Sequence, residues 1–158
     1  MIYSTATIPV NPAGARALTR DQVWAGLVLK ARDAGQFLPP GMCTRCEVLF
    51  EGKDHLMREA VILGDTLHEF VSFVPKQKVS FHQVKSPREG VIVNEINEDA
   101  SGQLQLRFYA YLGLLGEASG SDKERDQQAM LDSDERGYPA ALRATLARTR
   151  ALVLEGKL

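Results

Sequence analysis

Six consecutive segments with alternating apolar and polar residues, joined by short turns, constrain the fold of this chain most strongly. They span about residues 44–51, 55–63, 66–74, 78–84, 90–97 and 103–112. Alternation of this kind is typical of β-strands with one buried face, and the intervening sequences are rich in Gly, Asp, Ser and Pro. Because the turns are short, we expect consecutive strands to pair antiparallel in one sheet.

The segment before these strands predicts one more strand and one helix. Residues 2–10 are rich in β-branched and apolar side chains, which favour a strand. Thr19 precedes Gln22 by three residues, the spacing of a capping box that begins a helix. Apolar residues then recur at helical spacing as far as Ala31.

The last part of the chain predicts a long helix. A charged run covers residues 123–136, and an apolar stripe at helical spacing follows it: Leu142, Leu146, Thr149 and Val153. Pro139 lies between them and is expected to kink or restart the helix, because it lacks a backbone N–H. The predicted fold is α+β, with a seven-stranded curved antiparallel sheet around this helix and an internal cavity between them.

Length and charge restrict the function classes. A chain of 158 residues with 44% hydrophobic residues corresponds to one globular domain, residues 1–158. Its net charge of -1 gives no reason to expect nucleic-acid binding. The sequence shows neither a signal peptide nor an apolar run long enough to span a membrane. We therefore expect a cytoplasmic protein that does not bind membranes.

Several motifs occur in order along nearly the whole chain. They are Pro9–Pro12, Leu18–Leu27 followed by Lys30–Arg32, Arg58–Glu59 before Gly64, Glu69, Asn94 with Ile96, and the tail Leu154–Leu158. In this combination the sequence resembles the AtaL-like family of the START-like, or SRPBCC, superfamily. The resemblance implies a helix-grip fold with an internal cavity and no established reaction. Relatives in the superfamily include lipid carriers, hormone receptors, polyketide aromatase/cyclases and a few hydrolases, so the fold does not choose a function.

Four polar residues lie on strand faces whose other residues are apolar and predicted to be buried: Arg58, Glu69, Gln83 and Asn94. A hairpin turn at Gly64-Asp65 makes Arg58 and Glu69 near cross-strand neighbours. Three alternatives follow. The two residues form a pair that binds the polar end of a ligand, or they form a purely structural salt bridge, or both face water. In the first case, we expect Phe81 and Phe108 to line the apolar part of the site. Trp24 is interpreted mainly as a core residue that also flanks the pocket mouth.

Other chemistry-bearing residues give weak signals. Cys43 and Cys46 form a CxxC motif, but no second ligand pair for zinc accompanies it. The three histidines, His55, His68 and His82, lie on separate strands without metal-ligand spacing. Nucleophile-elbow, P-loop and dinucleotide-binding motifs are absent from the sequence. We therefore expect no metal and no cofactor.

Three functional hypotheses remain from the sequence. The first is a binding protein for a small, largely apolar organic molecule in the cavity. The second is an enzyme of specialised metabolism, such as a cyclase, dehydratase or isomerase, in which Arg58 stabilises an enolate and Glu69 transfers a proton. The third is an interaction module with a filled cavity. Exposed strand edges make a homodimer as reasonable as a monomer.

Overall fold

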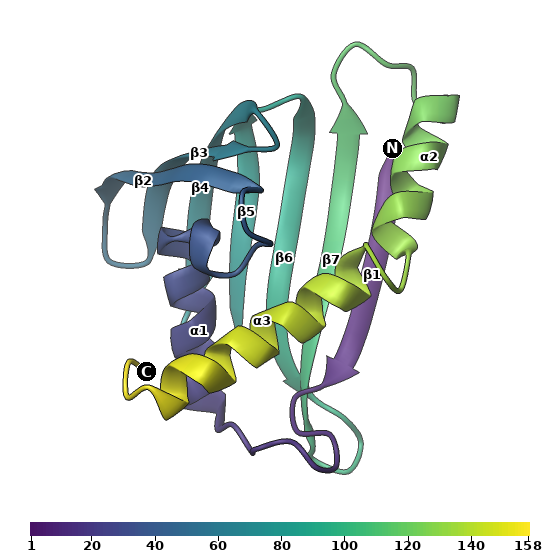
Figure 1. Cartoon of the computed structure of the whole chain (residues 1–158). Coiled ribbons are helices and arrows are strands. Elements are labelled where there is room, and N and C mark those ends of the chain that lie inside the picture. Colours follow the sequence, from purple (N-terminus) through teal and green to yellow (C-terminus); the bar gives the residue numbers. More distant parts are fainter.

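The computed structural model describes all 158 residues, and its elements follow the predicted order (Figure 1). The strands are β1 (Ile2–Pro9), β2 (Cys43–Glu51), β3 (His55–Ile62), β4 (Asp65–Val74), β5 (Lys78–Lys85), β6 (Arg88–Glu98) and β7 (Leu104–Leu114). The helices are α1 (Arg20–Arg32), α2 (Asp122–Asp132) and α3 (Tyr138–Leu154), with one 3-10 turn, η1 (Ala34–Gln36). The α+β class is confirmed.

All seven strands form one antiparallel sheet in the order β1-β7-β6-β5-β4-β3-β2. The β3–β4 hairpin turns through Leu63 and Gly64, whose φ angles are 53° and 88°. Two successive positive φ angles match the right-handed twist of the flanking strands, so this two-residue loop fixes the register. As a result, Arg58 lies directly opposite Glu69.

The helices gather on one face of the curved sheet. In Figure 1, α3 crosses in front of the strands, with α1 beside its C-terminal end and α2 along β1. The predicted capping box of α1 is present, because Thr19 and Gln22 each satisfy the other's backbone N–H. Helix α2 ends at Asp132, and a separate helix, α3, begins at Tyr138. Pro139 lies in the first turn of α3, where a proline removes no helical hydrogen bond. None of the three helices is both long and apolar enough to cross a membrane.

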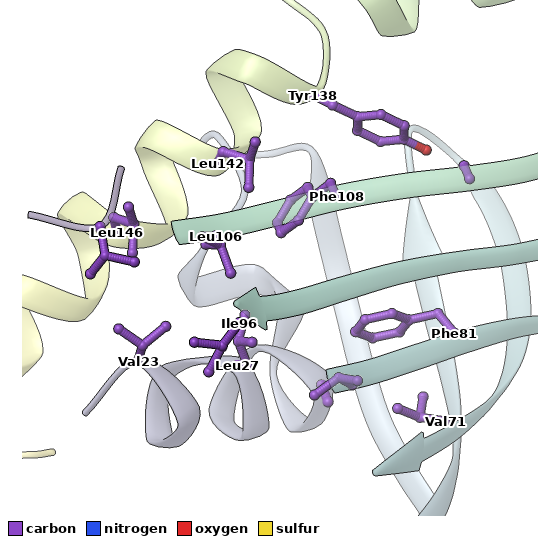
Figure 2. Close-up of a cluster of buried hydrophobic side chains, with 14 of the residues drawn as sticks. Val23, Leu27, Val71, Phe81, Ile96, Leu106, Phe108, Tyr138, Leu142 and Leu146 are labelled. Carbon is purple, nitrogen blue, oxygen red and sulfur yellow. The ribbon is translucent and has the colours of Figure 1, made fainter. Parts of the chain in front are cut away.

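A single cluster of buried apolar side chains joins the helices to the inner face of the sheet. Figure 2 shows residues of α1 and α3 on one side of the cluster and residues of β4 to β7 on the other: Val23, Leu27, Leu142 and Leu146 face Val71, Phe81, Ile96, Leu106 and Phe108. The faces predicted from alternation are therefore the faces that pack. Burial of these side chains holds the sheet in its curved form.

Gly26 of α1 packs directly against Thr149 of α3. A Cβ atom at this position would lie 2.3 Å from Oγ1 and 2.9 Å from Cγ2 of Thr149. Thr149 is fully buried, and its hydroxyl donates a hydrogen bond to the Thr145 carbonyl oxygen at 2.8 Å. A larger residue at position 26 must therefore push the helices apart.

Replacing Gly26 with alanine is expected to lower the free energy of unfolding by about 1–2 kcal/mol, because overpacking outweighs the better helix propensity of alanine. Urea denaturation measures this change. The double variant Gly26→Ala/Thr149→Ala should recover much of the loss, since it removes the clashing side chain. A Gly26→Ala protein more stable than the parent would contradict close packing here.

Candidate functional site

Arg58 and Glu69 form a buried ion pair on the inner face of the sheet. Nε and Nη2 of Arg58 lie 2.7 and 2.6 Å from Oε2 of Glu69, and the two residues are 5% and 4% exposed. Nε2 of Gln83 donates to the other Glu69 oxygen at 2.7 Å. The prediction of interior faces is confirmed for these side chains, and the alternative that the pair faces water is wrong. Each carboxylate oxygen of Glu69 already accepts hydrogen bonds.

The same arginine connects the sheet to the end of α1. Nη1 of Arg58 donates to the carbonyl oxygens of Lys30 and Ala31, each at 3.0 Å. Carbonyls in the last turn of a helix have no partner within the helix, and a cation there also complements the helix dipole. The Phe81 ring lies 4.8 Å from the guanidinium carbon. All three nitrogens of Arg58 thus have acceptors, and the side chain fixes the last turn of α1 against β3.

Lys30 extends from that fixed turn toward the sheet. Its Nζ lies 3.2 Å from Oδ1 of Asn94, 3.3 Å from Oγ1 of Thr145 and 4.2 Å from the centre of the Phe108 ring. Lys30 forms no ion pair. Burial, reinforced by the Arg58 guanidinium and partly opposed by Glu69, lowers the pKa of Lys30 from 10.5 to about 7.

A partly open pocket of about 160 Å³ lies beside these groups, between the sheet, α1 and α3. It is smaller than the about 300–1,000 Å³ of pockets that hold drug-sized ligands. Its wall is mostly apolar, with polar groups at a few positions: Lys30, Ala34, Leu38, Arg58, Ile62, Leu67, Glu69, Phe81, Arg88, Ile92, Asn94, Phe108, Tyr138 and Ala141. The pocket is open on one side, whereas the sequence predicted an internal cavity.

Two polar atoms near this pocket are buried without a hydrogen-bond partner: the Tyr138 hydroxyl and Oε1 of Gln83. The Tyr138 ring packs edge-on against Phe108, with 6.1 Å between ring centres (Figure 2). Burial raises the pKa of Tyr138 to about 12, so its hydroxyl stays protonated at neutral pH. An unpaired buried hydroxyl costs free energy, and a ligand oxygen in the pocket would supply the missing partner.

Trp24 does not join the other predicted site residues. It packs edge-on against Phe73 with 6.1 Å between ring centres, and it borders a separate surface pocket of about 230 Å³ formed with Arg32, His55 and Pro75, among others. The two pockets share no residue. Trp24 also packs against the edge of the core, which fits its interpretation as mainly a core residue.

The structure therefore brings together Arg58, Glu69, Gln83, Asn94, Phe81 and Phe108, all six of the predicted site residues other than Trp24. Sequence reasoning missed Lys30, Arg88, Thr145 and Tyr138. Lys30 had a detectable signal, because it follows Leu27 by three residues on the buried side of α1. Tyr138 had none, since its environment depends on how α3 restarts.

The remaining candidates, the two cysteines and three histidines, do not form a common site. Cys43 and Cys46 are free thiols near the start of β2, and Cys46 lies 4.0 Å from Nη1 of Arg58. His68 pairs with Glu59 at 2.6 Å on the outer face. No three His, Cys, Asp or Glu side chains come together as a metal site.

Comparison with models of known protein families identifies the family of this chain. The model of the family described as "AtaL: Acetylaranotin biosynthesis cluster protein L" matches residues 4–156. The chain belongs to the AtaL family. The match extends over nearly all of this AtaL-family protein, so the resemblance seen in the sequence motifs is confirmed. No curated protein sequence matches it.

Solved structures with a similar fold accompany the family match. The Zhui aromatase/cyclase from Streptomyces sp. R1128 superposes with a TM-score of 0.67 and 19% identity, covering 96% of the AtaL-family chain and 94% of its own. TTHA0849 from Thermus thermophilus superposes with a TM-score of 0.64 and 11% identity, covering 95% of the AtaL-family chain and 97% of its own. The di-domain ARO/CYC StfQ of the steffimycin biosynthetic pathway superposes with a TM-score of 0.63 and 16% identity. The match covers 98% of the AtaL-family chain and 51% of StfQ. At these identities the likeness establishes the helix-grip fold.

Proposed function

We propose that this protein binds a small, largely apolar organic molecule with an oxygen function in the pocket between the sheet, α1 and α3. The main support is that Tyr138 lines a mostly apolar pocket and that its buried hydroxyl has no hydrogen-bond partner within the protein. Pockets with apolar walls and a few converging polar groups are the usual form of ligand sites. The pocket volume of about 160 Å³ favours a compact ligand of one or two rings.

The charged residues at the pocket wall indicate which polar group the ligand carries. Arg58 and Glu69 neutralise each other, which leaves Arg88 as the cationic group at the wall, beside the partly charged amine of Lys30. Nothing at the wall besides Glu69 carries a negative charge. A phenol, enol or carbonyl oxygen is the ligand group that these donors favour.

Isothermal titration calorimetry with 2-naphthol tests the proposal, since this probe combines two apolar rings with one hydroxyl. We expect saturable binding to the parent protein. Ala141→Trp should abolish it, because Ala141 lines the pocket and an indole there fills the space. Ala144→Trp is the matched control, as Ala144 is exposed on the same helix and should leave binding unchanged. Equal binding by both variants would contradict a site in this pocket.

Tyr138→Phe separates binding from stability. The unfolding free energy should change by less than about 0.5 kcal/mol or rise, because the lost hydroxyl has no protein partner. The affinity for 2-naphthol should fall about tenfold, the cost of one hydrogen bond of about 1.4 kcal/mol. Thermal denaturation and calorimetry provide the two measurements. A clear loss of stability with unchanged affinity would show that the hydroxyl serves the fold.

An enzymatic function is the second candidate. The aromatase/cyclase names of two structural neighbours and the lowered pKa of Lys30 favour a role in the chemistry of a hydrophobic intermediate. In that case Lys30 is better placed than Glu69 to exchange protons, because both oxygens of Glu69 are occupied. The third hypothesis, a filled cavity, has less support, since the pocket has space for a ligand.

A further inference from the structure

The amine of Lys30 is held in one orientation. Oδ1 of Asn94 and Oγ1 of Thr145 both lie within hydrogen-bond distance of Nζ, at 3.2 and 3.3 Å. The Thr145 hydroxyl donates its own proton to the Ala141 carbonyl oxygen at 2.8 Å, so toward Lys30 it acts as an acceptor. A neutral amine has two N–H groups and one lone pair. Once both N–H groups are donated to these acceptors, the lone pair remains free.

The surroundings of Lys30 favour that neutral form. Its charged and titratable neighbours around the pocket are Arg58 on β3, Glu69 on β4, Arg88 on β6 and Tyr138 on α3. Glu69, which is paired with Arg58, and the face of the Phe108 ring favour the charged amine, but burial and the Arg58 charge outweigh them. With its pKa lowered to about 7, a large share of Lys30 is unprotonated at neutral pH. For an ordinary surface lysine that share is roughly one in a thousand.

We propose that Lys30 is a nucleophilic amine that forms an imine with the carbonyl carbon of an apolar aldehyde or ketone held in this pocket. This rests on the proposed function, because the carbonyl compound must first bind there. The proposal narrows the ligand class to carbonyl compounds and assigns the covalent step to a residue of α1.

The step balances without any further reagent. The Nζ lone pair attacks the carbonyl carbon, a C–N bond forms, and the carbonyl oxygen takes up a proton. The resulting carbinolamine loses that oxygen as water, which carries away both protons originally on Nζ, and a C=N bond remains. Tyr138 lines the same pocket, and its hydroxyl has no hydrogen-bond partner, which makes it the donor we assign to the carbonyl oxygen. No electron is gained or lost in the exchange.

Reductive trapping tests the imine directly. The folded protein is incubated with benzaldehyde and sodium cyanoborohydride, and the benzylated lysines are identified by peptide mass spectrometry. We expect labelling at Lys30 to be at least about tenfold faster at pH 7.5 than at Lys85, which is exposed and unpaired on β5. The rate at Lys30 should rise through pH 7 and then level off, whereas the rate at Lys85 should continue to rise toward pH 10. Lys30→Met should leave only the slow surface labelling.

Labelling of Lys30 no faster than that of Lys85 would overturn the imine proposal. Titration with 2-naphthol on the same preparation then tells the two proposals apart. If 2-naphthol binds, the pocket is a ligand site without a nucleophilic amine. If it does not bind, the proposed function fails as well.

Discussion

Replacing Arg58 with alanine is expected to lower the free energy of unfolding by about 3–5 kcal/mol. The substitution leaves the Glu69 carboxylate, which is 4% exposed, without its cationic partner. It also removes the donor to the carbonyl oxygens of Lys30 and Ala31 at the end of α1. Urea denaturation monitored by circular dichroism measures the loss.

A matched control uses the other arginine–glutamate pair that involves β3. Arg45 pairs with Glu59, but the Arg45 side chain is 55% exposed. Arg45→Ala should therefore cost less than about 1 kcal/mol. The double variant Arg58→Met/Glu69→Leu should regain most of the stability lost in Arg58→Ala, because it leaves no unpaired buried charge. Equal losses for Arg58→Ala and Arg45→Ala would contradict the buried role of the first pair.

Lys30→Met is expected to change the pH dependence of stability. Below pH 7 both the folded and the unfolded parent carry a charged Lys30, and the folded state bears the full cost of burying that charge. Between about pH 7 and pH 10.4 the unfolded state binds a proton that the folded state does not, so the unfolding free energy rises with pH. The unfolding free energy of the parent should therefore rise, relative to that of Lys30→Met, by about 4 kcal/mol between pH 6 and pH 10.

The comparison with Lys30→Met isolates this one group, because other titrations contribute equally to both proteins. Denaturation curves at several pH values from 6 to 10 provide the measurement. Parallel stability profiles over that range would mean that Lys30 keeps an ordinary pKa in the folded protein, and the nucleophilic role would lose its physical basis.

The inner faces of the strands were predictable because a period of two assigns each residue to one side. Arg58, Glu69 and Asn94 were identified as interior in this way, and the Leu63-Gly64 turn of the β3–β4 hairpin brought the first two into direct register. Alternation says nothing, however, about which interior polar groups are satisfied by one another. Only the three-dimensional structure shows that Arg58 donates its hydrogen bonds to Glu69 and to the carbonyl oxygens of α1.

The helical contribution to the site was harder to predict. A lysine near the end of a helix is usually solvated, so the spacing of Lys30 from Leu27 and its place in a family motif did not suffice to predict a site residue. Lys30 is half-buried, and its amine is placed by contacts with Asn94 on β6 and Thr145 on α3, which no local pattern encodes. Trp24 was placed near the pocket mouth, yet it borders a different pocket, because helical residues share a face only when they are three or four positions apart, and Trp24 and Lys30 are six apart.

The central claim is that a small apolar molecule binds between the sheet, α1 and α3, and methyl NMR tests it most directly. The protein is labelled at its isoleucine, leucine and alanine methyl groups and titrated with 2-naphthol. We expect shift changes to concentrate at methyl groups of the pocket wall, Leu67, Ile92 and Ala141, while the exposed Leu63 and Leu154 stay unchanged. The absence of shifts at the pocket wall over the whole titration would contradict it.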